Sequence, residues 1–441
     1  MAFVRRHDAL SWGRIVRTPQ LVASPRFRED LFAVIAARPG DAVLPVGMRR
    51  SYGDCVMNSR GGIIEMTGID RFMTLDLAAG TLQAEAGMTL SEIMRRVVPF
   101  GFFVPVTPGT RFITLGGAIA NDVHGKNHHR AGTFGCHVNR LSLLRTDGTR
   151  GEIGPECNSD LFAATVGGLG LTGIIEWVEI KLQPIKSSQL EVEIVPFDNL
   201  TQFWELAAAS NATHEHTVAW IDCAAEGRRL GRGIFSRGNW SSQGGLAVHD
   251  DHQRVRVAID APAHLLNRFS IRLFNRLYYS RQARKSCKQR QHYASFFHPL
   301  DSIADWNRLY GRHGFWQYQC VMPPSTMKDA IAALLAEIAS SGQGSFLAVL
   351  KSFGDVASPG LLSFPMEGAT LALDFPNRGD RTLRLLSRLD VIVQEAGGRL
   401  YAAKDGRIPK NMWVAGYPNL HRFMAHIDPA IASDFWRRVS P

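Results

Sequence analysis

Two adjacent glycines, three histidines and a lysine occur within one short stretch, residues 114–129, which reads Thr-Leu-Gly-Gly-Ala-Ile-Ala-Asn-Asp-Val-His-Gly-Lys-Asn-His-His. Paired glycines let a backbone approach a ligand closely, whereas histidine and lysine are poorly suited to burial in a core. The combination predicts an enzyme and makes His124 and Lys126 candidate site residues. His128 and His129 are adjacent and cannot chelate as an i, i+4 pair, so we expect no metal site.

Two further glycine-rich segments accompany this stretch. Residues 45–54, Pro-Val-Gly-Met-Arg-Arg-Ser-Tyr-Gly-Asp, follow an expected strand and are suited to wrapping a pyrophosphate through successive backbone N–H groups. Residues 168–173 match G-x-G-x-x-G, but an expected helix precedes them and an expected strand follows. A nicotinamide-binding Rossmann site needs the opposite order. We therefore interpret these glycines as a tight helix-to-strand turn packed against a ligand.

The elements that must position these segments follow from hydrophobic periodicity and turn residues. We expect strands over residues 44–46, 62–66, 72–76, 81–86, 141–145, 151–153, 173–181, 190–195, 218–221, 346–351 and 370–375. We expect helices over residues 90–97, 161–166, 327–340 and 382–396. The length of 441 residues indicates two domains, with insertion of one in the other as one arrangement, and residues 183–188 resemble a boundary.

Composition predicts a cytoplasmic globular protein. No run of about 18 apolar residues is present, and the N-terminus lacks the apolar core of a secretory signal. Six cysteines without CxxC spacing indicate free thiols in a reducing compartment. The formal charge of +10 favours an anionic partner. We expect no nucleic acid, because no helix-turn-helix, zinc or RNP-type signature is present.

The excess positive charge is concentrated between Asp260 and Asp301, where no acidic residue occurs. Arg268, Arg272 and Arg276 would share one face of a helix, with apolar side chains opposite. The pattern is typical of a helix lying on an anionic membrane surface, and equally of a solvated basic face over an ordinary core. The basic members of the segment are Arg268, Arg272, Arg276, Arg281, Arg284, Lys285, Lys288 and Arg290.

The three glycine-rich segments, taken together, resemble the FAD-binding domain of the vanillyl-alcohol-oxidase (PCMH-type) flavoprotein family. The likeness runs nearly end to end. Its motifs lie at residues 11–14, 50–54, 108–117, 124–129, 297–301, 306–308, 317–319, 374–376 and 398–405. The His-Gly-Lys-Asn-His-His loop and the Lys404-Asp405 pair are the most specific of these.

The resemblance implies an α+β fold with a two-part FAD-binding domain, residues 1–185 and 398–441. Residues 186–397 would form an inserted substrate domain on an antiparallel sheet flanked by helices. Carried over position by position, the residues expected along the cofactor are Gly47, Arg50, Ser51, Tyr52, Gly53, Asp54, Gly109, Thr114, Gly116, Gly117, Asn121, His124, Ile175 and Tyr401. Arg50 stands where some branches carry a flavin-linking histidine, which implies non-covalent FAD.

The branch that this chain resembles oxidises the 2'-hydroxyl of a polyprenylphosphoryl-β-D-ribofuranose to a 2'-keto intermediate. That step is the first half of epimerisation to the arabinofuranose donor of cell-envelope glycans. The implied partners are the polyprenyl-phosphate-linked pentose, a short-chain NAD(P)H reductase, quinone or O2 as electron acceptor, and an anionic membrane surface. We therefore expect peripheral association with the inner membrane, on the cytoplasmic side or at the periplasmic face. The alternative is an O2-using aldonolactone or alditol oxidase of the same family.

Alcohol oxidation requires a base for the hydroxyl proton. Lys404 is the first candidate, since a desolvated lysine can lose its charge near neutral pH; the alternative is a charged Lys404 that binds phosphate or flavin. His124 is a second base or an orienter of the hydroxyl.

Further residues are suited to binding the substrate. Lys126 and Lys351 are suited to holding its phosphate, the latter mainly by resemblance. Gln317 and Gln319 would present amides to sugar hydroxyls from one face of a strand. Trp220 would wall the pocket.

Two positions depart from the family pattern. Arg49 stands where relatives have a second glycine in the pyrophosphate loop, and a side chain there constrains the turn. The strand expected in the sugar pocket reads Thr370-Leu371-Ala372, whereas some members of the family carry asparagine and cysteine in this strand. We therefore expect the sugar pocket to differ from theirs and to offer no thiol at Ala372.

Overall fold

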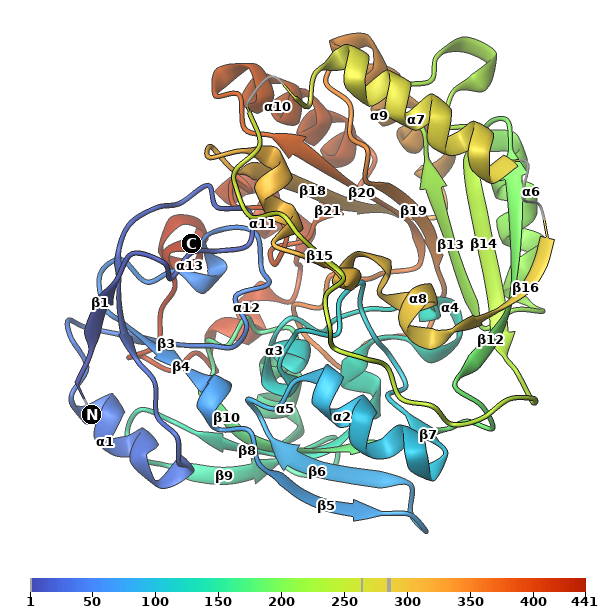
Figure 1. Ribbon diagram of the computed structural model, residues 1–441. Helices are drawn as coiled ribbons and strands as arrows, with labels where there is room; N and C mark the ends of the chain where they lie inside the picture. Colours follow the sequence, from blue (N-terminus) through green and yellow to red (C-terminus); the bar gives the residue numbers. More distant parts are fainter. Residues whose placement is uncertain (1, 263–264, 284–286) are drawn as a thin grey trace.

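The computed structural model describes residues 2–262, 265–283 and 287–441. Figure 1 shows smaller sheets from the first part of the chain at the lower left and one large sheet with its helices at the upper right. The red C-terminal helices lie beside the blue N-terminal strands. The α+β class expected from the sequence is confirmed.

The first lobe contains two main sheets. The four-stranded sheet has the order β1 (Val4–Arg6), β2 (Gln20–Ala23), β4 (Gly62–Glu65), β3 (Val43–Val46), with β2, β4 and β3 parallel. The five-stranded antiparallel sheet has the order β5 (Phe72–Asp76), β6 (Thr81–Glu85), β10 (Ile174–Lys181), β8 (Val138–Leu144), β9 (Arg150–Ile153). Short pairs join β7 (Phe102–Phe103) to β11 (Gln183–Pro184) and β15 (Val255–Arg256) to β17 (Ile303–Ala304).

Side-chain caps mark the start of two helices of this lobe. Thr89 and Glu92 form a capping box at the start of α2 (Leu90–Val97), which satisfies two backbone N–H groups reciprocally. Thr114 caps α3 (Leu115–Ala120) by accepting from Gly117 N. The remaining helices of the lobe are α1 (Leu31–Ala36), α4 (His128–Ala131) and α5 (Ser159–Thr165).

The second lobe is built on an eight-stranded antiparallel sheet. Its order is β16 (Cys287–His292), β12 (Gln189–Phe197), β14 (Gly233–Trp240), β13 (His216–Ile221), β19 (Ala348–Phe353), β20 (Gly368–Pro376), β18 (Phe315–Met322), β21 (Arg399–Leu400). Its helices are α6 (Leu200–Asn211), α7 (Arg268–Ala283), α8 (Tyr293–Phe297), α9 (Met327–Ser341) and α10 (Asp380–Glu395).

Alternation along the strands gives this sheet two different faces. Ile221, Leu350 and Leu373 point into the apolar cluster that includes Leu334 of α9 and Leu385 of α10. The neighbouring positions along β13, β19, β20 and β18 therefore point to the opposite face. That face carries the polar side chains described below.

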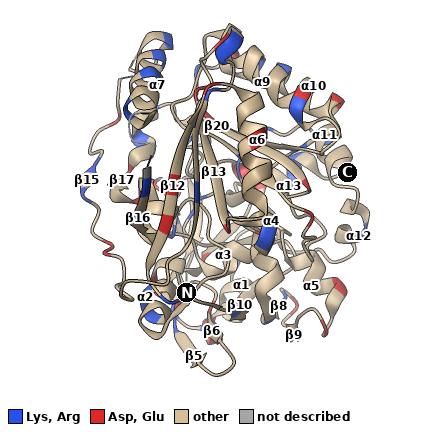
Figure 2. Cartoon of the chain, turned by 90° about the vertical axis from the view of Figure 1, so that its right-hand side faces the viewer, with Lys and Arg blue, Asp and Glu red and all other residues tan. Residues whose placement is uncertain are grey.

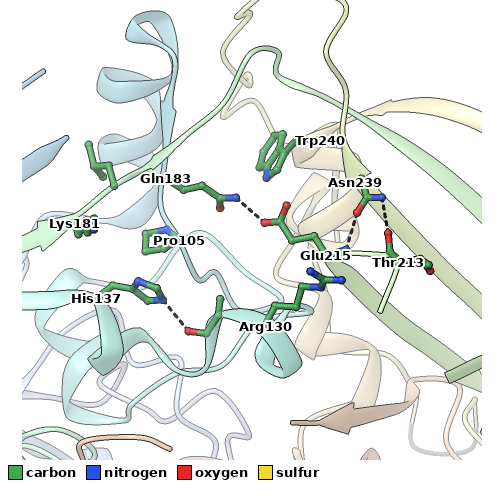
Figure 3. A pocket seen from close by; sticks show the side chains of 11 residues that line it. Pro105, Arg130, His137, Lys181, Gln183, Thr213, Glu215, Asn239 and Trp240 are labelled. Carbon is green, nitrogen blue, oxygen red and sulfur yellow. Dashed lines mark hydrogen bonds between the residues drawn. The ribbon is translucent and has the colours of Figure 1, made fainter. Parts of the chain in front are cut away.

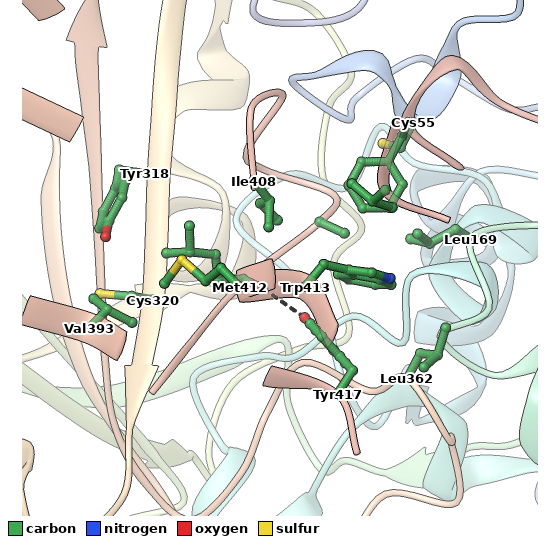
Figure 4. Packing of buried hydrophobic residues seen from close by; sticks show 14 of the residues in the cluster. Cys55, Leu169, Tyr318, Cys320, Leu362, Val393, Ile408, Met412, Trp413 and Tyr417 are labelled. Carbon is green, nitrogen blue, oxygen red and sulfur yellow. Dashed lines mark hydrogen bonds between the residues drawn. The ribbon is translucent and has the colours of Figure 1, made fainter. Parts of the chain in front are cut away.

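The C-terminal segment, with α11 (Lys410–Gly416), α12 (Leu420–Met424) and α13 (Asp434–Val439), packs back on the first lobe. Val43 N donates to Ala430 O at 2.9 Å, and Arg438 pairs with Asp54 at 2.9 Å. Figure 4 shows Trp413 lying between Leu169 of the first lobe and β18 of the large sheet. This buried cluster joins the two lobes.

The strands and helices expected from the sequence are confirmed, within a few residues at their ends. The five cysteines whose side chains are described are free thiols, as expected. The side chain of the sixth, Cys287, is not among the described side chains, and Arg284 and Lys285 of the basic segment lie outside the described residues. Across the described ranges, each helix is too short or too polar to cross a bilayer.

Candidate active site

A cavity lies where the three glycine-rich segments meet. Six of the expected cofactor residues line it, namely Gly47, Thr114, Gly116, Gly117, Asn121 and Ile175. Pro45, Cys55, Leu169 and Gly170 complete much of its wall. The segments therefore converge on one space, although they are far apart in the sequence.

Glycines keep this cavity open. A Cβ on Gly47 would lie 2.2 Å from Oγ1 of Thr114, the residue that caps α3. Gly170 and Gly173 adopt φ values of +73° and +154°, which disfavour other residues. The G-x-G-x-x-G segment is thus the helix-to-strand turn that we expected, with α5 before it, β10 after it and the cavity beside it.

The loop that leaves the cavity after Gly47 offers donors for an anion. None of the backbone N–H groups of residues 48–51 donates a hydrogen bond to another described residue. Successive free N–H groups form the kind of concave backbone surface that binds phosphate. The residues present therefore fit the pyrophosphate of FAD.

Arg49 occupies the left-handed region in this loop, with φ +52°. Its guanidinium pairs with Glu65 at 3.1 Å, and Glu65 also binds Arg6. A side chain anchored in this way offsets the cost of a conformation that glycine would adopt freely. The departure from the family's glycine pattern is therefore compatible with the same turn.

The other expected cofactor residues of this loop do not line the cavity. Arg50 stacks 4.1 Å from the ring centre of Trp12 and donates from Nε to Phe112 O at 3.2 Å. Ser51 accepts at its carbonyl from Trp12 N. A Cβ on Gly53 would lie 2.3 Å from Cα of Gly406, so the loop packs closely on the C-terminal return.

Two more of these residues connect distant segments. Tyr401 donates from its hydroxyl to Asn121 O at 2.7 Å, which ties the end of the large sheet to α3. The carboxylate of Asp54 is held by Arg438, so its observed role is to fix the loop against α13. Gly109 faces open space, since a Cβ added to it would meet no atom within 4 Å.

His124 lies at the contact between the lobes. Gln319 donates from Nε2 to Nε2 of His124 at 2.9 Å, so the second ring nitrogen carries the proton. Burial, together with the nearby positive charge of Lys351, holds the pKa of His124 well below its usual range. His124 is therefore neutral, with a donor at Nδ1.

Three lysines are near enough to affect one another's pKa in sequence, Lys404 acting on Lys351 and Lys351 on Lys126. Burial lowers the pKa of Lys126 to about 7 and those of Lys351 and Lys404 to about 8. Lys351 lowers the pKa of Lys126, and Lys404 lowers that of Lys351, so charge repulsion acts between Lys351 and each of the other two. Lys126 donates to Phe296 O and Lys351 to Gly125 O, leaving further ammonium protons free for an anion.

Lys404 lies over the ring of Tyr52, 4.4 Å from its centre. The negative charge of Asp374 partly offsets the effect of burial and raises the pKa of Lys404. Asp374 is itself buried, which raises its pKa to about 7, and it accepts from Gln317 Nε2 at 2.9 Å. The sequence motif at 374–376 marked this segment, but no reasoning from the sequence assigned the carboxylate a role.

Strand register brings the other expected residues to this face. Gln317 lies opposite Asp374, and Gln319 lies opposite Ala372. Trp220 lies opposite Val349, two positions before Lys351, and donates from Nε1 to Phe346 O at 2.9 Å. The structure thus gathers every expected substrate residue on one face of the large sheet or on the loop that faces it.

A second hollow lies elsewhere, between the two lobes (Figure 3). Gln183 donates to Glu215 across it at 2.6 Å, and Arg130 and Lys181 line its rim. It contains none of the residues expected from the sequence to hold cofactor or substrate.

Comparison with known proteins agrees with this geometry. A family model described as an FAD binding domain matches residues 19–154. Decaprenylphosphoryl-beta-D-ribose oxidase of Mycolicibacterium smegmatis is 35% identical, with 98% of this chain and 96% of the relative covered. L-gulonolactone oxidase of Mus musculus is 27% identical over 34% of each chain. A putative D-arabinono-1,4-lactone oxidase of Neurospora crassa is 23% identical over 45% of this chain and 36% of the relative.

Proposed function

This chain belongs to the family of decaprenylphosphoryl-beta-D-ribose oxidases and is an FAD-dependent oxidoreductase; on that premise, we propose that it oxidises the 2'-hydroxyl of a polyprenylphosphoryl-β-D-ribofuranose. The product would be the 2'-keto sugar, still attached to polyprenyl phosphate. The observation that supports this proposal best is the group of three buried lysines beside a neutral histidine, His124, which follows Asn121 of the cavity wall by three residues.

Each side chain of the site has a part in this reaction. FAD, when bound, supplies the acceptor for the hydride that leaves the carbinol carbon. Lys404 takes the hydroxyl proton, because a pKa of about 8 leaves a usable neutral fraction near pH 7. His124 donates from Nδ1 to the same hydroxyl oxygen and orients it, since Gln319 already occupies its other nitrogen.

Binding of the substrate divides between charge and hydrogen bonds. Lys126 and Lys351 hold the phosphate, and an anion there would relieve their mutual repulsion. Gln317 and Gln319 bind sugar hydroxyls, and Trp220 forms the wall. Ala372, opposite Gln319, leaves this part of the pocket apolar and without a thiol.

We also propose that the chain is organised into two domains. Residues 1–185 and 398–441 would form one FAD-binding domain, and residues 186–397 the substrate domain. The contacts of Val43 and Asp54 with the C-terminal segment support this division. FAD would be held without a covalent bond, since Arg50 provides no nucleophile and is engaged with Trp12.

We extend the proposal to the surroundings of the enzyme. A short-chain NAD(P)H reductase would complete the epimerisation, and quinone or O2 would reoxidise the flavin. The lipid substrate would bring the enzyme to an anionic membrane surface as a peripheral protein.

Helix α7 supports the membrane proposal. Phe269, Leu273 and Leu277 lie four residues apart and are 81%, 58% and 60% exposed, and they are therefore not packed on a core. Arg268 and Arg276 are exposed on the same helix, and Figure 2 shows its basic residues in blue. Exposed apolar side chains flanked by arginines suit an interface with anionic lipid.

Anaerobic mixing of the FAD-loaded protein with substrates tests the proposed reaction. We expect farnesylphosphoryl-ribose to bleach the flavin absorbance and free alditols or aldonolactones to leave it unchanged. Bleaching by the alditol or lactone alone would favour the aldonolactone oxidase alternative, which the partial likeness to L-gulonolactone oxidase supports.

A further inference from the structure

A continuous series of aromatic rings runs outward from Lys404. Lys404 lies 4.4 Å from the ring centre of Tyr52, and Tyr52 meets Phe315 at 5.4 Å between ring centres. Phe315 stacks on Tyr310 at 4.1 Å, and Tyr310 stacks on Phe346 at 5.5 Å. The first part of the series is buried, since Phe315 is 0% and Tyr310 5% exposed.

The series continues to helix α7 at the surface. Phe346 contacts Phe274 of α7 at 5.7 Å, and Phe274 stacks on Tyr278 at 6.0 Å. Tyr278 contacts Trp220 of β13 at 4.7 Å. Phe274 is 46% exposed, and Phe346, Tyr278 and Trp220 are partly exposed. We call these four rings the aromatic track.

The track begins next to the group that would hold the substrate phosphate. Trp220 lies opposite Val349, and Lys351 is the next residue on the same face of β19. In the middle of the track, Phe274 and Tyr278 are each one residue from Leu273 and Leu277, the exposed apolar residues of α7. Apolar surface therefore extends from the lysine group to the outer face of this helix.

We propose that the aromatic track binds the first isoprene units of the substrate's polyprenyl chain and guides the chain from the phosphate to the surface of α7. This inference rests on the proposed function. A branched alkene chain gains free energy by leaving water for aromatic faces, and large rings provide that area with few degrees of freedom to lose. Helix α7 would thus contact lipid in two ways, with the chain on Phe274 and Tyr278 and the bilayer on Leu273 and Leu277.

Sugar-free probes test the track separately from the oxidation. Binding of farnesyl phosphate and of methyl phosphate to the FAD-loaded protein is measured by titration calorimetry, without vesicles or detergent. We expect Phe274→Ser to lower the affinity for farnesyl phosphate by about tenfold, because most of the contact made by one aromatic ring is lost. Methyl phosphate should bind the variant and the natural protein alike, since it does not reach the track.

Two further variants complete the experiment. Phe274→Leu keeps apolar bulk and should recover most of the affinity for farnesyl phosphate. Val391→Ser removes an apolar side chain that is 54% exposed on α10, outside the track, and should match the natural protein. Equal affinity of Phe274→Ser and the natural protein for farnesyl phosphate would overturn the proposal. Failure of farnesylphosphoryl-ribose to bleach the flavin would instead refute the proposed function, whatever the result of this titration.

Discussion

Gln319 and His124 are 195 positions apart in the chain, yet they share a 2.9 Å hydrogen bond between their Nε2 atoms. The bond joins strand β18 of the large sheet to the glycine-rich loop of the first lobe. It also fixes the tautomer of His124, because the amide nitrogen of Gln319 can only donate. The relative position of the lobes and the protonation of the site are therefore linked.

Removal of the proposed base should stop the oxidation. We expect Lys404→Ala to lower the rate of flavin reduction by roughly 10²–10⁴-fold, the usual contribution of a positioned base. Stopped-flow absorbance under anaerobic conditions measures that rate, and the flavin content of the variant shows whether the cofactor site is intact. Lys410→Ala, at an exposed position of α11, is the control. Unchanged reduction by Lys404→Ala would remove Lys404 as the base.

The rate of reduction should increase with pH up to about 8. A lysine acts as a base in its neutral form, and burial lowers the pKa of Lys404 to about 8. The rate should therefore increase with pH until about pH 8 and stay constant at higher pH. The charge of Asp374 raises this pKa. Asp374→Asn should therefore move the rising limb to lower pH, while Asp380→Asn, at an exposed position, should leave it in place. If the rising part of the pH–rate profile stayed at the same pH in Asp374→Asn, the effect of the Asp374 charge on the pKa of Lys404 would be contradicted.

A single methyl group in the cavity should weaken FAD binding. Gly47→Ala would bring a Cβ to 2.2 Å from Thr114 Oγ1, so the cap of α3 or the loop must shift. We expect FAD affinity to fall by about tenfold or more, equivalent to about 1.4 kcal/mol, measured by fluorescence titration of the apoprotein. Gly151→Ala, which meets no atom within 4 Å, should bind FAD normally.

Anionic vesicles should recruit the protein through α7. Replacing both Phe269 and Leu277 with serine should lower binding to phosphatidylglycerol-containing vesicles by roughly tenfold, because apolar insertion and charge act together. Sedimentation with vesicles measures this, and pure phosphatidylcholine vesicles should bind weakly. Added salt should also reduce binding to the anionic vesicles, since it screens the arginines. Equal sedimentation of the double variant would contradict the proposed interface.

Much of the fold was predictable because periodicity acts locally. Helix α2 has the expected bounds, since a capping box begins it and its apolar spacing continues for its whole length. Strands β8 and β9 were likewise expected, and they pair on either side of a Thr-Asp-Gly turn.

Long-range pairing was not accessible in the same way. Strand β14 and helix α6 were not among the expected elements, and their places depend on the strands with which they pack. Asp374 was missed as a neighbour of Lys404 because the two meet only through the pairing of β18 with β20 and the turn after Tyr401. A lone aspartate in an otherwise apolar strand was the available signal.

The path of the chain sets an order for assembly. Val43 forms backbone hydrogen bonds with residues 430 and 432, and Asp54, at the end of the loop that follows, forms an ion pair with Arg438. During synthesis from the N-terminus, Asp54 is made nearly four hundred residues before Arg438. The contacts that hold this loop from the C-terminal side can therefore form only after α13 has been synthesised.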